Sequence, residues 1–286
     1  MLTLRSFTVD DIPFGLRLTA QAGWNQTSDD WRRVVEMEPA GCFVGCWNGV
    51  AAATTTVCVF GDTAWIAMVL TDESFRGRGL ATALIRRALD EIESRGIATM
   101  RLDATALGRS VYERFGFTVD YEVTRFGAIA TPSDASAGEA ATPFNIRPLA
   151  DCDWTAALDL DRRASGCDRR KLLQSLRDGE RARAYVADGE RELQAFVLGR
   201  AGCRAYQIGP CIARRPEAAQ AVVRRMIDSL IGRDLLIDVP DPNGPAGEIV
   251  RQFRFVPQRK FFRMTRGPSG GESPDLQYAS AGPEFG

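Results

Sequence analysis

The stretch of this sequence best suited to chemistry is a glycine-rich loop, Arg76-Gly77-Arg78-Gly79, between an apolar run and an amphipathic segment. The run from Trp65 to Leu70 is typical of a strand. The segment after the loop is predicted to be a helix with one buried face, because apolar residues recur at helical spacing: Leu80, Leu84, Ile85, Ala88, Leu89 and Ile92. A helix N-terminus directs free N–H groups outward, and glycine lets a phosphate approach the backbone. The sequence therefore predicts an anion-binding site at this loop.

The spacing of the loop separates it from two common phosphate loops. No lysine follows Gly79, as G-x-x-x-x-G-K-[ST] requires, and Thr82 stands where G-x-G-x-x-G needs its last glycine. Residues 76–81, in the form R-x-x-G-x-A, resemble the acetyl-CoA pyrophosphate loop of the GNAT superfamily of N-acetyltransferases. Residues 112–117 are similar to the Y-x-x-x-G-F segment of that superfamily, and the resemblance covers residues 3 to about 127.

The resemblance implies acetyl-CoA as co-substrate and assigns two groups of residues to it. Backbone groups at the end of a splayed strand would pair with the pantetheine arm and face the thioester: Val69, Leu70 and Thr71. The loop and the first helical turn would hold the pyrophosphate: Arg76, Gly77, Arg78, Gly79, Leu80, Ala81 and Thr82. The alternative for either arginine is a solvated loop residue.

Tyr112 occupies the position of the superfamily's general acid, which protonates the CoA sulfur. The alternative is a half-buried helix tyrosine that packs on the sheet. The resemblance has one departure here, because the usual asparagine seven residues before the tyrosine is Thr105. This departure weakens the contacts expected with the pantetheine arm.

A general base is not evident, because strand 63–70 holds no carboxylate, where many relatives carry one. Asp103 is the candidate, but Asp238 matches it in the second half of the chain after a local shift of three residues. A residue shared by an active and a degraded copy is better explained by a structural role. Water, Asp72 or Glu73 could accept the proton instead.

The sequence predicts a helix that opens at Asp10 and runs through Ala22, and a second helix that Ser28 can cap. The acceptor would bind between them, at Gly23–Thr27, where relatives in the superfamily bind theirs. Trp24 and Asn25 are the candidate contacts, because an exposed aromatic ring beside amides suits a small polar or aromatic ligand. The alternative is that Trp24 packs beneath the loop.

Length and charge limit the class of protein. A chain of 286 residues favours two domains, each with its own core. A net charge of −1 and a pI of about 5.8 provide no field to attract nucleic acid or an anionic membrane. No run of about 18 apolar residues occurs, so we expect no membrane partner and a cytoplasmic protein.

The sequence contains no histidine, which excludes a Ser-His-Asp or Cys-His nucleophile and argues against a zinc site. Its seven cysteines are scattered and odd in number, which argues against a disulfide framework. Cys42 and Cys46 are the only close pair, and buried apolar packing explains them without a metal. We therefore expect no metal.

An internal repeat predicts two whole domains. At a numbering difference of 138, residues 84–87 match 222–225, and Asp90 matches Asp228. At the same difference Gly79 becomes Glu217 and Tyr112 becomes Val250. A carboxylate would then stand where pyrophosphate must lie, so the second copy is expected to be degenerate and to bind no acetyl-CoA.

The expected fold class is α/β (α+β), a mixed sheet in two tandem GNAT folds. The expected ranges are a catalytic domain at 1–128, a flexible linker at 129–143, a degenerate GNAT-like domain at 144–266 and a disordered tail at 267–286. The two copies could pack as an internal pseudo-dimer, so we expect a monomer or a weak homodimer.

The resulting hypothesis is an N-acetyltransferase that moves an acetyl group from acetyl-CoA to a primary amine of a small molecule, by direct transfer in the N-terminal domain. Two alternatives stay open. One is a protein lysine or N-terminal acetyltransferase, and the other is a non-catalytic protein that senses acyl-CoA or acts as a scaffold.

Overall fold

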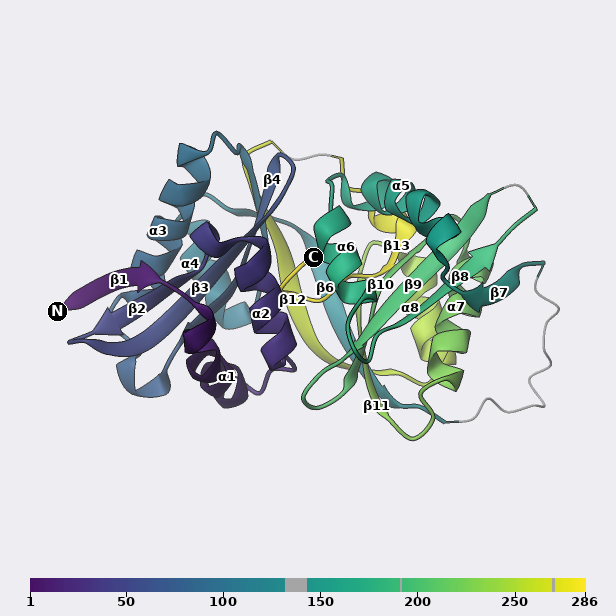
Figure 1. Cartoon of the computed structure of the whole chain (residues 1–286), viewed down its shortest axis with the longest axis horizontal. Coiled ribbons are helices and arrows are strands. Elements are labelled where there is room, and N and C mark those ends of the chain that lie inside the picture. Colours follow the sequence, from purple (N-terminus) through teal and green to yellow (C-terminus); the bar gives the residue numbers. More distant parts are fainter. Residues whose placement is uncertain (132–142, 191, 269–270) are drawn as a thin grey trace. The chain divides into compact units, whose positions relative to one another are not determined.

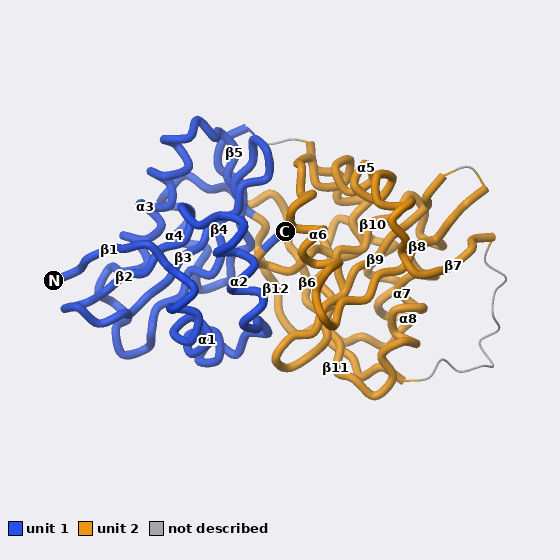
Figure 2. Tube along the Cα trace, in the orientation of Figure 1, with its two compact units in different colours: residues 1–118, 264–269, 285 blue, residues 119–263, 270–284, 286 orange. Residues whose placement is uncertain are grey.

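Figure 1 shows the computed structural model of the chain, which describes residues 1–131, 143–190, 192–268 and 271–286. The chain divides into two compact units (Figure 2). Unit 1 contains residues 1–118 and a segment that begins at Met264, and unit 2 contains residues 119–263 and most of the C-terminal segment. Most of the expected linker, residues 132–142, lies outside the described residues.

Unit 1 is a mixed sheet with helices packed on it. Its elements are β1 (Leu2–Ser6), α1 (Ile12–Gln21), α2 (Ser28–Met37), β2 (Phe43–Trp47), β3 (Val50–Phe60), β4 (Thr63–Thr71), α3 (Leu80–Ser94), β5 (Thr99–Ala104) and α4 (Ala106–Glu113). The strands lie in the order β1-β2-β3-β4-β5, antiparallel except for the parallel pair β4–β5. This confirms the mixed α/β sheet expected from the sequence.

Helix α3 packs through the apolar stripe predicted from its sequence, and all six of those residues are buried. Gly45 on β2 allows the close approach, because a Cβ there would lie 3.2 Å from Leu80 and 3.3 Å from Leu84. The stripe therefore fixes the N-terminal end of α3, and with it the glycine loop, above β2 and β3.

Helix α2 is capped by Thr27, the residue before its first turn. The Thr27 side chain accepts a hydrogen bond from the backbone of Asp30, and the Asp30 carboxylate accepts from the backbone N–H of Thr27 at 2.8 Å. This reciprocal cap orients α2 so that Trp31 stacks on Phe7, with the ring centroids 5.1 Å apart. The cap thereby fixes the end of the α1–α2 connection, where acceptor binding is expected.

Unit 2 repeats the order of elements. They are β7 (Asn145–Pro148), α5 (Trp154–Ser165), α6 (Arg170–Arg177), β8 (Arg183–Asp188), β9 (Leu193–Ala201), β10 (Tyr206–Ala213), α7 (Pro216–Asp228), β11 (Asp234–Pro240), α8 (Gly244–Gln252) and β12 (Val256–Arg266). The two halves even share an arginine–aspartate ion pair six residues apart, Arg5–Asp11 in one and Arg147–Asp153 in the other. The predicted repeat is therefore a repeat of whole folds.

The strand that ends the first copy, and a short segment that follows most of the last strand of the second, each belong to the unit of the other copy. β6 (Thr118–Ile129) lies almost entirely in unit 2, where it pairs antiparallel with β11 from Val123↔Pro240 to Ile129↔Asp234. In return, the segment from Met264 lies in unit 1, where Arg266 forms an ion pair with Glu93 of α3 at 2.6 Å. The compact units therefore differ from the expected ranges 1–128 and 144–266.

The expectation of a disordered tail is wrong for the described residues after 271. Pro274–Leu276 form a 3₁₀ turn, and Gln277–Ala279 form β13, which pairs with β10. Ala279 and Ala281 are completely buried. The tail is rich in glycine and proline and lacks periodicity, so its own sequence pattern does not predict an ordered structure. Its order comes from the contacts that other elements make with it.

Candidate active site

The glycine loop opens helix α3 in unit 1. Gly77 and Gly79 have φ values of +76° and +78°, a left-handed conformation that disfavours a side chain. A Cβ at either residue would meet nothing within 4 Å, so the protein leaves open space above both. Gly79 caps α3, and the N–H groups of the first turn have no carbonyl partner within the helix. The geometry is that of an anion site.

The two loop arginines differ in how they are held. Arg78 lies over two aromatic rings, with its guanidinium carbon 5.3 Å from the centroids of both Trp47 and Phe75. Arg76 forms an ion pair with Glu73 at 3.2 Å, and both side chains are largely exposed. Arg78 therefore presents a positioned charge at the loop.

Strands β4 and β5 separate in front of this loop. Their parallel pairing covers only Thr63–Trp65 with Thr99–Arg101. Beyond that point β4 contains a bulge, because its register with β3 shifts between Thr54 and Thr56. The backbone of residues 66–71 is thereby released from β5, which is the splayed end expected for the groups of Val69, Leu70 and Thr71.

One backbone residue in the bulge is strained and one side chain supports it. Met68 has φ = +49°, which is unusual for a bulky residue. The hydroxyl of Thr54 donates a hydrogen bond to the Met68 carbonyl at 2.8 Å in the buried interior. The sequence analysis missed both residues, although three consecutive threonines in a buried strand, residues 54–56, were an available signal.

Tyr112 lies on α4, the helix that directly follows β5. Its ring meets Phe117 edge-on with centroids 6.0 Å apart, and a Cβ at Gly108 would lie 3.4 Å from it. The Tyr112 hydroxyl forms no hydrogen bond with any of the residues that the structure describes. Burial raises the pKa of this phenol well above its ordinary value, so the hydroxyl keeps its proton at neutral pH.

Thr105, which replaces the superfamily's usual asparagine, caps the same helix. Its side chain accepts a hydrogen bond from the backbone N–H of Gly108 at 3.3 Å. Thr105 thus anchors the start of α4, the helix that carries Tyr112, a cap that an asparagine could also form.

The carboxylates near the site differ in their suitability as a base. Asp103 lies partly buried near the end of β5. Its repeat partner Asp238 forms a bidentate ion pair with Arg125, which supports a structural role for this position. The side chain and backbone N–H of Ser74, aided by Arg17, lower the pKa of Asp72 to about 2, so Asp72 is a poor proton acceptor.

The connection between α1 and α2 holds the two acceptor candidates. Trp24 is half-buried, and its backbone N–H donates to the Thr19 carbonyl at 2.9 Å. Asn25 is buried, with 6% of its surface exposed. Trp24 is therefore partly accessible at this position, whereas Asn25 beside it is buried.

No group of three or more His, Cys, Asp or Glu side chains in the described ranges is arranged to hold a metal ion. Burial raises the pKa of Cys42 to about 12, so its thiol packs as an apolar group. In the same ranges, no helix is long and apolar enough to cross a membrane.

The corresponding position in unit 2 lacks the glycine loop. β10 and α7 are joined by residues 214 and 215 alone, whereas residues 72–79 join β4 and α3. Pro216 and Glu217 occupy the first turn of α7, so one N–H is missing and a carboxylate is present. Val250, which takes the place of Tyr112, is buried on α8.

Comparison with known proteins agrees with this geometry. A model of the acetyltransferase (GNAT) family matches residues 13–117, and a model of an acetyltransferase (GNAT) domain matches residues 157–279. The fold is that of two acyltransferase domains in tandem. The chain belongs to the GNAT superfamily, as the sequence analysis predicted.

Solved structures show the same tandem architecture. A putative acetyltransferase from Pyrococcus horikoshii has a TM-score of 0.84 and 23% identity, covering 100% of this chain and 96% of its own. A tandem GNAT protein from the clavulanic acid biosynthesis pathway has a TM-score of 0.68 and 14% identity, covering 94% and 100%. At these identities the likeness establishes the fold.

Among curated proteins, the chain is similar to the [ribosomal protein bS18]-alanine N-acetyltransferase of Escherichia coli K12. The two are 34% identical over 73 residues, which cover 24% of this chain and 49% of the relative. The chain thus matches about half the length of the curated relatives.

Proposed function

We propose that this protein is an N-acetyltransferase that moves an acetyl group from acetyl-CoA to a primary amine of a small molecule, by direct transfer in unit 1. The observation that carries the proposal is that two features follow one another along residues 66–80. A bulged strand end separates from its neighbour, and two left-handed glycines then open a helix N-terminus toward empty space.

The residues of unit 1 suit acetyl-CoA, which would supply the acetyl thioester as a substrate. Residues 76–82 would bind the pyrophosphate through N–H groups, aided by the charge of Arg78. The freed backbone of residues 69–71 would pair with the pantetheine arm, and an N–H there would donate to the thioester oxygen.

Transfer forms a C–N bond and breaks a C–S bond. Tyr112 would give its proton to the leaving sulfur, a role that suits a phenol kept protonated by burial. The amine must lose a proton, and water or Asp103 would accept it. Trp24 and Asn25 would lie on the acceptor side, between α1 and α2.

A second candidate acceptor is the N-terminal amine or a lysine of a protein. The observation that favours it is the similarity to the bS18-alanine N-acetyltransferase, whose name gives an alanine of a ribosomal protein as its substrate. Unit 1 would then use the same groups for acetyl-CoA, and only the acceptor would differ.

The test is release of free CoA thiol from acetyl-CoA across matched acceptors. The panel contains aliphatic diamines, amino sugars, aromatic amines, a peptide with a free N-terminal alanine, and a peptide whose only amine is a lysine. We expect turnover with a small amine, whereas turnover confined to the peptides would select the second candidate. Tight acetyl-CoA binding without turnover by any acceptor would select a sensing or scaffold role.

A further inference from the structure

In unit 2 a third strand enters the opening between β10 and β11. These strands pair in parallel only over Tyr206–Ile208 with Leu235–Ile237, just as β4 and β5 pair over three residues. Beyond that point β13 pairs with β10 instead, at Cys211↔Ala279 and Ile212↔Gln277. On the other side, the backbone N–H of Ser280 donates to the Asp238 carbonyl of β11 at 2.8 Å.

The walls of this opening are shaped to the segment inside it. A Cβ at Gly209 would lie 2.0 Å from the Ser280 carbonyl oxygen, so only glycine lets the segment approach β10. The Asn243 amide donates to three carbonyls of the segment, those of Pro274, Asp275 and Gln277, at 3.0–3.2 Å. The same side chain caps α8 through its oxygen, which accepts from the backbone of α8 at 3.0 Å.

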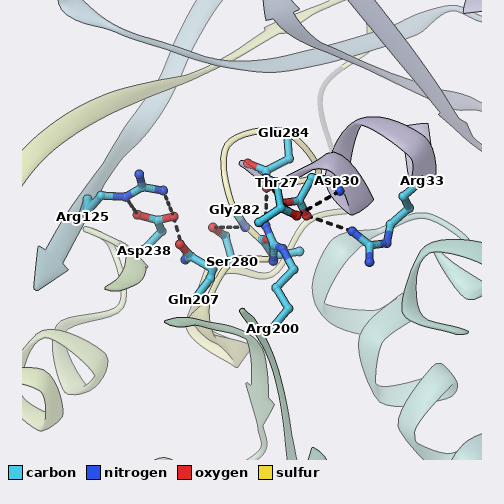
Figure 3. A network of polar contacts seen from close by, with 11 residues as sticks. Thr27, Asp30, Arg33, Arg125, Arg200, Gln207, Asp238, Ser280, Gly282 and Glu284 are labelled. Atoms are coloured by element: carbon cyan, nitrogen blue, oxygen red, sulfur yellow. Dashed lines mark hydrogen bonds and ion pairs between the residues drawn. The ribbon is translucent and has the colours of Figure 1, made fainter. Parts of the chain in front are cut away.

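Further side chains of unit 2 hold the rest of the segment. Gln277 donates to the Ala164 carbonyl of α5 at 2.8 Å. Arg200 of β9 donates to the Ala281 carbonyl at 2.8 Å and forms a buried ion pair with Glu284 (Figure 3). Contacts from α5, α8, β9, β10 and β11 therefore converge on this one segment.

We propose that the opening between β10 and β11 is a peptide-binding groove whose occupant is residues 274–284 of the same chain. The pantetheine arm is an extended chain with two amides, and a peptide backbone offers the same alternation of N–H and C=O groups. Unit 2 thus binds its own peptide where unit 1 would bind the cofactor arm. Only this last comparison rests on the proposed function.

The test uses the full chain and the variant Asn243→Asp. A carboxylate keeps the oxygen that caps α8 but replaces the donor of three hydrogen bonds with an acceptor facing three carbonyls. Hydrogen exchange should therefore show the amides of residues 277–280 opening about 100-fold faster, while those of α8 change little. Asn145→Asp, an exposed substitution of the same charge in β7, is the matched control and should leave both unchanged.

Gln277→Ala provides an independent variant, because it changes the segment itself and leaves the walls intact. It should also accelerate exchange at residues 277–280. Exchange of these amides in the wild type as fast as in an unstructured peptide would overturn the proposal. A second acetyl-CoA bound in unit 2 of the wild type would overturn it too, because the segment would then not fill the opening. Complete absence of acetyl-CoA binding would instead refute the proposed function and leave the exchange result standing.

Discussion

At the residue scale, the proposed role of Tyr112 is to donate the proton to the leaving sulfur. Burial raises the pKa of its phenol, which therefore keeps its proton, and its ring meets that of Phe117 edge-on. Tyr112→Phe should lower kcat by about 10²–10⁴-fold, the usual contribution of a general acid, and leave acetyl-CoA affinity nearly unchanged. Steady-state kinetics beside calorimetric titration measures the two effects. Full turnover in the variant would mean that the tyrosine only packs.

Two adjacent threonines on β3, Thr54 and Thr55, allow a test variant to be compared with a matched control. Thr54 donates to the carbonyl of the strained Met68, whereas the buried Thr55 hydroxyl has no hydrogen-bond partner in the described structure. Thr54→Val should cost about 1–3 kcal/mol of unfolding free energy and weaken acetyl-CoA binding, because the bulge loses its support. Thr55→Val should be neutral or stabilising.

Urea unfolding and acetyl-CoA titration of both valine variants check this pair. Thr54→Ser, which restores the hydroxyl, should recover the lost affinity. Equal effects of Thr54→Val and Thr55→Val on affinity would show that Thr54 does not support the bulge.

Features that depend on residues close together in the sequence were predictable, whereas features that depend on contacts between distant residues were not. Gly77 and Gly79 were predictable because loop and helix are neighbours in sequence. The role of Thr54 depends on its register with Leu70, sixteen residues later, and no local pattern encodes a bulge. Asn25 was expected to contact the acceptor, and its burial depends on packing that the sequence does not display.

At the element scale, the N-terminus of α3 is the feature that distinguishes unit 1 from unit 2. Gly79→Glu should abolish measurable acetyl-CoA binding, because it adds bulk and negative charge where the pyrophosphate would lie. Gly96→Glu is the matched control, since Gly96 has φ = +70° just beyond the opposite end of α3 and also faces open space.

Both glutamate variants should lose similar stability from backbone strain, and calorimetry should show that only Gly79→Glu loses the ligand. Equal affinity in the two variants would remove the loop from the acetyl-CoA site.

The stability contributed by the ion pair between Arg17 of α1 and Asp72, just after β4, should depend on pH. Ser74 and Arg17 lower the pKa of Asp72 from its ordinary value of 3.8 to about 2. A carboxyl whose pKa is lowered by folding stabilises the fold above the unfolded pKa, and that stability disappears as pH falls through the folded value. Asp72→Asn should therefore lower Tm at pH 7, and the difference from wild type should vanish between about pH 4 and pH 2.

Thermal unfolding across this pH range checks the linkage. A difference in Tm that stays constant down to pH 2 would show that the Asp72 charge contributes nothing.

At the scale of the whole molecule, the repeat was predictable, but the exchange of β6 and of the segment from Met264 between the two units was not. A constant numbering difference exposes two copies, because matched helices keep their apolar stripes. The polar composition of residues 130–143 then placed the domain boundary after β6. Composition marks where the chain is polar, but it does not tell which sheet a strand joins, so β6 was assigned to the wrong unit.

The exchange makes a strong prediction about fragments. Residues 144–266 correspond to the expected second domain, but they lack β6 and the C-terminal segment, both of which belong to unit 2. Without Arg125, the carboxylate of Asp238 would be buried with its ion pair broken (Figure 3), which costs about 3–5 kcal/mol. Since a domain has only about 5–15 kcal/mol of stability, losing a central strand as well should leave the fragment unfolded.

A longer fragment, residues 119–286, retains β6, the ion pair and the segment in the groove. Urea titration followed by circular dichroism should show a cooperative transition for residues 119–286 and none for residues 144–266. Arg125→Ala in the longer fragment should destabilise it, since it removes the ion pair while keeping the strand. A cooperative transition in residues 144–266 would contradict the exchange, because that fragment could then form its sheet without the strand supplied by the first copy.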